Sequence, residues 1–238
     1  MPLTRSTLDY SNFERLPLQS PVDRLVYITD ACVGKFVIDV GCMDETAQIK
    51  RDGEHWLHGR ICLVARQVLG VDNSPLVPPE GFPTGHTSRI VRGDATSLDL
   101  QSAGMNHVDV IVAGEFIEHI ENPSSFLNGI KSKFPGRVLI LSTPNGTSFS
   151  NTLMGLLRRE VQHPDHLHNF TFKTLNTLCI RANFEEWEII PYRFYATEMI
   201  LRSTGMRRLT ARVAEFGIRI VERAFPSLSF GYIIKATI

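Results

Sequence analysis

Acidic side chains and glycines follow four short apolar runs of the chain, at the points where each run ends. In chain order they are Asp39, Gly41 and Cys42; Asp72 and Asn73; Asp94 and Ala95; and Glu115. A carboxylate can accept hydrogen bonds from both hydroxyls of a ribose, and a glycine lets backbone approach a ligand closely. Taken together, the four run ends predict a site for a nucleoside-containing ligand.

A second group of side chains could move a proton. Glu115, Glu118 and His119 lie at offsets of three and four, which places them on one face if the segment turns helically. His119 is a candidate general base at the mouth of the fourth run. A later loop holds three further histidines, His163, His166 and His168. The alternatives are that the acids cap helices or form ion pairs, and that the histidine loop is a polar lid.

Alternating strand and helix patterns must position these residues. Apolar, β-branched runs predict strands over 36–40, 68–72, 89–92, 108–113, 137–142, 185–191 and 230–238. Helical spacing predicts helices over 21–31, 55–67 and 171–182, and Asn122 before Pro123 begins another. The alternation predicts an α/β fold with a Rossmann-like, doubly wound, mostly parallel seven-stranded sheet and helices on both faces. Ligands of such sheets bind beyond the carboxyl ends of the strands.

The 238 residues suit one domain over 1–238, with 1–34 as an N-terminal helical extension. The prolines and glycines of 75–88 predict a loop, and 195–225 is a helical insertion before the last strand, a candidate substrate lid.

The insertion has an amphipathic pattern. Its apolar stripe is Leu209, Val213, Phe216 and Ile220, and the opposite, charged face is Arg208, Arg212, Glu215, Arg219 and Glu222. We expect the stripe to pack on the core or on a second subunit, and the charged face to be solvated. The arginines could alternatively contact an anionic substrate or a membrane surface.

Composition restricts the partners. Lysine plus arginine equals aspartate plus glutamate, so no global field attracts nucleic acid, which is disfavoured as a partner. The four cysteines, Cys32, Cys42, Cys62 and Cys179, lack C-x-x-C spacing, which argues against a zinc site or disulfide framework. The polar N-terminus and the lack of a long apolar run predict a soluble, cytoplasmic protein.

The motifs resemble the class I S-adenosylmethionine (SAM)-dependent methyltransferases, in particular the ubiquinone-pathway O-methyltransferases and bacterial enzymes acting on glycans and natural products. They span about residues 36–191 and read VIDVGC, LGVDNSP, RGDATSLDL, DVIVAGEFIEHIENP, VLILSTPNG and HPDHLHNFTFKTLNTL. The resemblance implies that SAM is bound by Asp39, Gly41 and Cys42 at its methionine part, Asp72 and Asn73 at the ribose, Asp94 and Ala95 at the adenine, and Glu115 beside the sulfonium. The chain departs from the family where Met43 and Glu45 replace the usual second and third glycines.

This resemblance implies methyl transfer to a hydroxyl of a small molecule or sugar-containing metabolite, with His119 and His168 as catalytic residues. The chain is also similar to the small-RNA 2′-O-methyltransferases, in which two glutamates and two histidines bind a divalent metal. The matching positions are Glu115, Glu118, His119 and His168, which would make Mg²⁺ a second cofactor. The alternatives are a non-catalytic SAM-binding partner subunit and an RNA 2′-O-methyltransferase, and a homodimer is left open. A nicotinamide dehydrogenase would need G-x-G-x-x-G after the first strand, where the chain reads Gly41-Cys42-Met43-Asp44.

Overall fold

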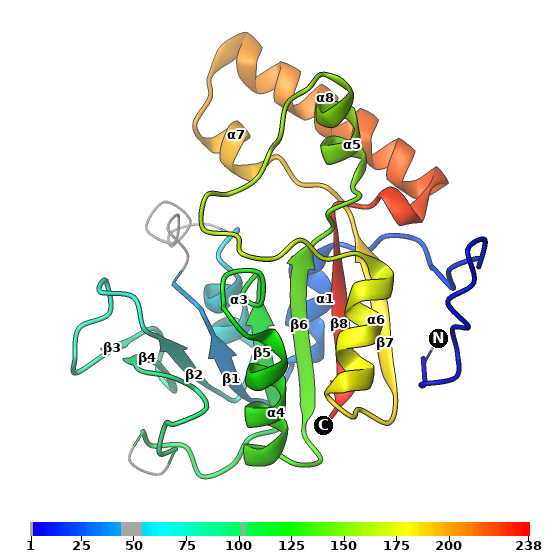
Figure 1. The fold of residues 1–238 in the computed structure, drawn as a ribbon. Helices are drawn as coiled ribbons and strands as arrows, with labels where there is room; N and C mark the ends of the chain where they lie inside the picture. The colour runs from blue at the N-terminus through cyan, green and yellow to red at the C-terminus, as the bar shows by residue number, and fades with distance from the viewer. Residues whose placement is uncertain (1, 44–53, 101–102) are drawn as a thin grey trace.

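A mixed β-sheet forms the centre of the protein (Figure 1). The structure, a computed structural model, describes residues 2–43, 54–100 and 103–238. The strand order is β3-β4-β2-β1-β5-β6-β8-β7. Five neighbouring strands run parallel: β1 (Phe36–Val40), β2 (Gln67–Asp72), β4 (Ser88–Arg92), β5 (Val110–Gly114) and β6 (Val138–Pro144). Their parallel pairing gathers the carboxyl ends at one edge of the sheet, as the sequence predicted.

Three antiparallel pairings complete the sheet. β8 (Gly231–Thr237) lies between β6 and β7 (Trp187–Tyr192), and β3 (Phe82–Pro83) pairs with β4 at the opposite edge. The described sheet therefore has eight strands, which corrects the prediction of seven. β3 falls inside the predicted loop 75–88, because a strand of two residues carries no alternating pattern, and its proline is tolerated since β3 is an edge strand.

Helices cover both faces of the sheet. α1 (Arg24–Ala31) and α3 (Leu57–Val64) pack on one face through Ile28 and Ile61. α4 (Pro123–Lys133) and α6 (Phe172–Arg181) pack on the other through Leu127 and Leu175, in front of the sheet in Figure 1. The Asn122 side chain accepts a hydrogen bond from the Ser125 amide, so the predicted cap of α4 is confirmed. The predicted α/β, Rossmann-like architecture is confirmed as well.

The segment before α1 follows the far edge of the sheet. Leu3 forms an isolated bridge with Trp187, and Val22 forms one with Tyr192. Helical structure within the first 34 residues, as far as they are described, is restricted to α1. These bridges give β7 neighbours on its outer side, which shields an otherwise open edge.

Three helices lie beyond the carboxyl end of β6, away from the main layers (Figure 1). They are α5 (Phe149–Leu156), α7 (Thr197–Leu201) and α8 (Gly205–Ala224), and a short 3₁₀ turn, Pro226–Leu228, leads from α8 into β8. The two later helices fall inside the predicted insertion, whereas α5 was not predicted. No helix among the described residues is long and apolar enough to cross a bilayer.

The orientation of α8 corrects one expectation. Its apolar stripe points to solvent, because Leu209, Val213, Phe216 and Ile220 are between 55% and 68% exposed. Glu222 of the charged face is instead 1% exposed, and its Oε2 accepts the Phe194 amide at 2.8 Å. The stripe therefore does not pack on the core. A backbone N–H beyond the end of β7 needs an acceptor, and a glutamate supplies one where an apolar residue could not.

Candidate functional site

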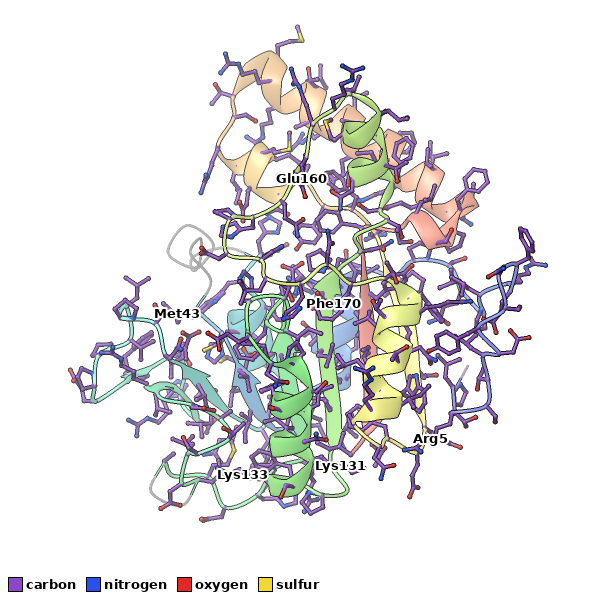
Figure 2. All side chains as sticks on the ribbon, viewed as in Figure 1. Arg5, Met43, Lys131, Lys133, Glu160 and Phe170 are labelled. Carbon is purple, nitrogen blue, oxygen red and sulfur yellow. The ribbon has the colours of Figure 1, made fainter. Side chains whose placement is uncertain are left out.

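The turn after β1 is tied to the end of β2. Gly41 has φ 68°, and a side chain there would collide with the Phe116 ring, so the turn needs glycine. Asp72 is 8% exposed, and its two carboxylate oxygens accept the amides of Met43 and Ser74, each at 2.8 Å. Figure 2 shows Met43 at the edge of the sheet where the strands end. Asp72 thus holds the turn in place although Met43 replaces a usual glycine.

Asp39 lies deeper, inside the sheet, and is 2% exposed. Its Oδ2 lies 2.9 Å from Nδ1 of His58 on α3, and Nε2 of His58 lies 3.0 Å from the Thr84 hydroxyl. Burial lowers the pKa of His58, but the hydrogen bonds and charges of Asp39 and Cys62 together outweigh it, and the pKa rises to about 9. His58 is thus a buried cation paired with Asp39. Sequence reasoning missed it, and the only signal was a histidine in a helix that otherwise reads as core.

Cys42 and the third strand end shape the rest of this edge. The Cys42 carbonyl accepts the Trp56 indole N–H at 2.9 Å, and burial raises the pKa of its thiol well above the usual range. Asp94 follows β4 and is exposed, and its Oδ1 accepts the Thr96 amide at 2.8 Å, while Ala95 is buried. Asn73 is exposed beside Asp72. All the predicted cofactor residues therefore lie at the carboxyl ends of β1, β2, β4 and β5.

Glu115 sits on the turn after β5 with φ 53°, a conformation that is uncommon for a residue with a side chain. Its Oε1 accepts the Tyr192 hydroxyl at 2.9 Å and the Tyr195 hydroxyl at 2.7 Å. Arg24 Nη2 lies 3.5 Å from Oε2. These partners come from α1 and from the end of β7, far apart in the sequence. Sequence reasoning missed all three, and no pattern of spacing could have found them.

The partners of Glu115 hold their protons firmly. Burial raises the pKa of Tyr192 and of Tyr195 well above the ordinary tyrosine range, and the charge of Glu115 raises both further. Burial alone would lower the pKa of Arg24, but Glu115, with smaller contributions from Tyr195, Tyr192 and Glu118, outweighs that effect and raises it. Two hydroxyl donors and one guanidinium therefore remain directed at Glu115 throughout the physiological pH range.

Glu118 is the most unusual acid of the site. It is 1% exposed, and neither of its carboxylate oxygens has a hydrogen-bond partner among the described residues. Burial, assisted by the charge of Glu115, raises the pKa of Glu118 to about 8. Residues 115–120 form turns, so the helical condition under which Glu115, Glu118 and His119 would share one face is not met. At neutral pH the Glu118 carboxyl is therefore mostly protonated.

His119 meets two loop histidines rather than His168. Its ring centroid lies 4.6 Å from that of His166 and 6.0 Å from that of His163, and one nitrogen of each ring lies within 4.8 Å of the others. Burial lowers the pKa of His166, and the neighbouring His119 and His163 rings lower it further. His166 is therefore disposed to stay neutral at the pH where an unperturbed histidine is half charged.

His168 anchors the loop that carries these rings. Its Nε2 lies 3.0 Å from the Ile120 carbonyl, and the amides of Leu167 and His168 donate to the Glu118 carbonyl at 2.8 and 3.1 Å. In Figure 2 this segment runs from Glu160 down to Phe170 over the strand ends. Within the described chain, the four predicted metal ligands thus do not gather at one point, since His168 faces backbone carbonyls.

A cavity of about 420 Å³ adjoins the Glu115 cluster and shares Arg24 and Tyr195 with it. Its described lining is rich in arginine: Arg24, Arg60, Arg193, Arg208, Arg212 and Arg219. Arg193 pairs with Asp23 at 2.7 Å, and Arg219 pairs with Glu215. No such ion pair is formed by Arg208 or Arg212 with any described residue. The cavity therefore offers two guanidinium groups to an anionic ligand.

Comparison with known proteins agrees with this geometry. A family model described as a methyltransferase domain matches residues 17–189. A SAM-dependent methyltransferase from Archaeoglobus fulgidus is 18% identical, with 90% of this chain and 91% of that chain covered at a TM-score of 0.51. A counterpart from Mesorhizobium loti is 15% identical, with 90% and 95% covered and a TM-score of 0.50.

A further solved structure, the small RNA methyltransferase HEN1, is 15% identical at a TM-score of 0.54. The match covers 94% of this chain but 27% of HEN1. Curated proteins yield no match. At these identities the solved structures establish a shared fold only. The family model matches more than half of the sequence and therefore shows the family.

Proposed function

Because the chain belongs to the class I SAM-dependent methyltransferase family, we propose that it transfers the methyl group of SAM to a hydroxyl of a small molecule or sugar-containing metabolite. The observation that carries the hydroxyl assignment is the position of His119, an exposed imidazole on the same strand-end turn as Glu115. A hydroxyl must lose a proton when it is methylated, and an imidazole can accept one near neutral pH.

The strand-end residues fit the cofactor. In this proposal Asp72 accepts the ribose hydroxyls, since each of its oxygens can accept a second hydrogen bond beside the Met43 or Ser74 amide, and Asp94 with Ala95 borders the adenine. Gly41, with its positive φ and its lack of a Cβ, brings the turn after β1 close to the methionine part. Cys42 and Asn73 flank these two regions. Asp39 acts through that turn, because its carboxylate is already paired with His58. When bound, SAM supplies an electrophilic methyl group on its sulfonium.

The chain's own residues orient the acceptor and move its proton. Arg24, Tyr192 and Tyr195 fix Glu115 beside the sulfonium position. A nitrogen of the His119 ring receives the hydroxyl proton, and the neutral His166 ring stands next to it to share that proton. His168 contributes by holding the loop against Ile120 rather than by contacting the reacting atoms. The loop also covers the strand ends, which limits the access of water.

The arginine-lined cavity favours an acceptor that carries an anionic group. Arg208 and Arg212 are one helical turn apart, so both guanidinium groups can reach the same phosphate or carboxylate. Because the cavity shares Tyr195 with the Glu115 cluster, an acceptor anchored there would lie next to the cofactor site. We therefore propose a charged, sugar- or phosphate-containing metabolite as the acceptor class.

A magnesium ion fits this site only in part. The unpartnered carboxyl of Glu118 beside Glu115 would suit a divalent cation, which prefers oxygen ligands. His168 faces the Ile120 carbonyl, however, and His119 faces imidazoles. The metal hypothesis is tested by exhaustive chelation of the active enzyme and by Glu118→Gln. Activity that survives both treatments would rule out the set of Glu115, Glu118, His119 and His168.

Cofactor binding is tested first, by titrating the protein calorimetrically with SAM and with its demethylated product. Asp72→Ala removes a carboxylate that accepts charged hydrogen bonds, so we expect affinity to fall roughly ten- to hundredfold. Asp30→Ala, an exposed acid on α1, is the matched control and should bind as wild type. A thermal scan of both variants separates lost contacts from lost folding. Unchanged affinity in folded Asp72→Ala would remove this residue from the site.

Catalysis is tested by measuring release of demethylated SAM over a panel of hydroxylated acceptors with and without anionic groups. His119→Ala should reduce turnover by a factor on the order of 10²–10⁴ and leave SAM affinity intact, because general-base catalysis contributes that much. His107→Ala, a change at a histidine that pairs with Asp109 at the amino end of β5, opposite the cofactor edge, is the control. If SAM binds but the wild-type protein methylates nothing in the panel, the non-catalytic subunit becomes the better interpretation. Turnover only on RNA would support the 2′-O-methyltransferase alternative.

A further inference from the structure

The outer surface of α8 presents a continuous apolar stripe to solvent. Leu209, Val213, Phe216 and Ile220 follow one another at spacings of four, three and four, and each is more than half exposed. Met206, one turn before Leu209, is 76% exposed. The helix α5, which packs beside α8, adds Leu153 and Leu156 at 40% and 78% exposure. An exposed apolar surface of this extent indicates an interaction site.

The charges around this stripe are of one sign. The exposed charged residues of α8 are all arginines, namely Arg207, Arg208, Arg212 and Arg223. Arg212 and Arg223 lie beside the stripe, one helical turn from Phe216 and Ile220, whereas Arg207 is on the opposite side of the helix. Both glutamates of the helix face inward, where Glu215 pairs with Arg219 and Glu222 accepts the Phe194 amide. The fold has therefore turned the acids toward the protein body and left only positive charge beside the apolar stripe.

From this arrangement we propose that α8 docks on the surface of an anionic lipid bilayer. The stripe lies at the boundary between headgroups and acyl chains, and the flanking arginines contact lipid phosphates. A helix with an apolar face bordered by arginine and with low overall hydrophobicity lies in the membrane interface and does not span it. The 20 residues of α8 make such a helix about 30 Å long. The docking does not rest on the proposed methyl transfer.

Charge favours a bilayer over the other occupants of such a face. A second copy of this chain paired through α8 would bring two rows of arginines together, and like charges across an interface oppose association. RNA would match the arginines, but single-stranded nucleic acid needs aromatic residues for stacking, and the stripe is mostly aliphatic. An anionic bilayer can do both, because its acyl chains bury the apolar stripe while its phosphates pair with the arginines.

The docked orientation would also place the arginine-lined cavity near the lipid. Arg208 and Arg212 belong to α8 and line that cavity. An acceptor whose anionic group enters the cavity could therefore remain attached to an acyl chain in the bilayer. This consequence depends on the proposed function, whereas the docking itself can be measured without any acceptor.

The test is sedimentation of the full-length protein with vesicles of phosphatidylcholine alone and of phosphatidylcholine mixed with phosphatidylglycerol. We expect binding to the mixed vesicles only, weakened by salt. The double variant Phe216→Ser/Ile220→Ser should bind at least roughly tenfold more weakly, because it removes buried apolar area. Arg212→Gln/Arg223→Gln, which removes the two arginines beside the stripe, should weaken binding to the mixed vesicles roughly tenfold or more, because each arginine near an anionic surface contributes about 1 kcal/mol. Leu63→Ser, a change at a residue that is 85% exposed but belongs to α3 in the main layers, is the matched control and should bind normally.

Three results would overturn the proposal. One is a wild-type protein that stays in the supernatant with anionic vesicles, and another is equal binding by Phe216→Ser/Ile220→Ser. The third is a wild-type dimer in sedimentation velocity that the double variant dissociates, which would assign the stripe to a second copy of the chain. A wild-type protein that binds RNA but not vesicles falls under the first result. Calorimetry with SAM on the same variants distinguishes the docking proposal from the proposed function. A variant that loses vesicle binding but keeps normal SAM affinity is changed at the docking surface of α8 and not at the cofactor site.

Discussion

At the residue scale, burial decides the charge of the groups that the sequence identified as chemical. Glu118 and Glu115 lie three positions apart, yet Glu115 is held by Arg24 and two tyrosines while Glu118 has no partner among the described residues. A carboxyl without partners in the interior favours its neutral form. The E-x-x-E-H motif therefore contains two acids in different environments, which the residue types alone do not reveal.

The pH dependence of stability should show the neutral state of Glu118. Its pKa is about 8 in the folded protein against 4.5 for the ordinary group, so the folded state binds more protons between these values. Stability from this residue therefore falls as pH rises from about 4.5 to 8. Glu118→Gln removes that fall. The free energy of unfolding of the variant, relative to that of wild type, should therefore be higher at pH 8 than at pH 5 by up to about a few kcal/mol.

Urea unfolding of wild type and Glu118→Gln at a series of pH values measures this difference. Glu121→Gln, a change at an exposed glutamate of the same segment, should track the wild-type curve. A constant offset between Glu118→Gln and wild type across the pH range would contradict the raised pKa. A variant that is less stable only when magnesium is present would instead favour the metal hypothesis.

At the element scale, α3 is fastened to β1 by an ion pair inside the protein. His58 on α3 and Asp39 on β1 are both nearly fully buried, and their contact spans 2.9 Å. The same strand ends in Gly41, so the pair also fixes the start of the turn that would meet the cofactor. The apolar spacing of the predicted 55–67 helix indicated where α3 packs, but not that its histidine carries charge into the core.

Removing His58 should destabilise the fold strongly. His58→Leu leaves the Asp39 carboxylate buried without its cation, for which we expect a loss of about 3–5 kcal/mol in the free energy of unfolding. The double variant Asp39→Asn/His58→Leu should recover part of that loss, since no charge stays buried. His86→Leu, at an exposed histidine, should cost little. Chemical denaturation measures all three, and equal losses in the single and double variants would contradict the ion pair.

The sign of the pH effect follows from the raised pKa of His58. Its pKa of about 9 in the folded state exceeds the ordinary value of 6.5, so its contribution to stability is complete below pH 6.5. That contribution is lost as pH rises through about 9. The difference in stability between wild type and His58→Leu should therefore shrink from pH 6 to pH 10.

At the scale of the whole molecule, the last strand, β8, contacts the predicted cofactor site indirectly, through Tyr192. β8 lies between β6 and β7, and a side chain at Gly231 would overlap the Tyr192 ring. Tyr192 in turn donates to Glu115. The C-terminal strand thus helps to position an acid on a turn more than a hundred residues earlier in the chain.

Gly231→Ala should therefore weaken both the fold and the cofactor site. Overpacking against Tyr192 costs about 1–3 kcal/mol of stability, and displacement of the Tyr192 hydroxyl loosens Glu115. We expect a lower thermal midpoint and weaker SAM binding by calorimetry. Gly217→Ala, on the exposed side of α8 with open space around it, is the matched control and should be neutral or stabilising. Normal SAM affinity in Gly231→Ala would show that β8 does not influence the cofactor site through Tyr192.

The sequence by itself determined the order of elements and the residues at the strand ends. Alternating apolar runs, glycine at Gly41 and the cap at Asn122 are local signals, because each depends on neighbours a few residues away. Parallel pairing then had to bring the strand-end acids to one edge, whatever the details of packing. The SAM-dependent methyltransferase family was indicated by the resemblance of the motifs at these strand ends to those of known members.

Tertiary structure alone decided which groups meet and which way α8 faces. Arg24, Tyr192 and Tyr195 converge on Glu115 from distant parts of the chain, and His119 contacts His163 and His166 while His168 turns to a backbone carbonyl. An amphipathic pattern has two faces, and periodicity does not say which one is buried. In α8, Glu222 faces inward, where it accepts a hydrogen bond from the backbone amide of Phe194, and the apolar stripe on the other side of the helix faces solvent.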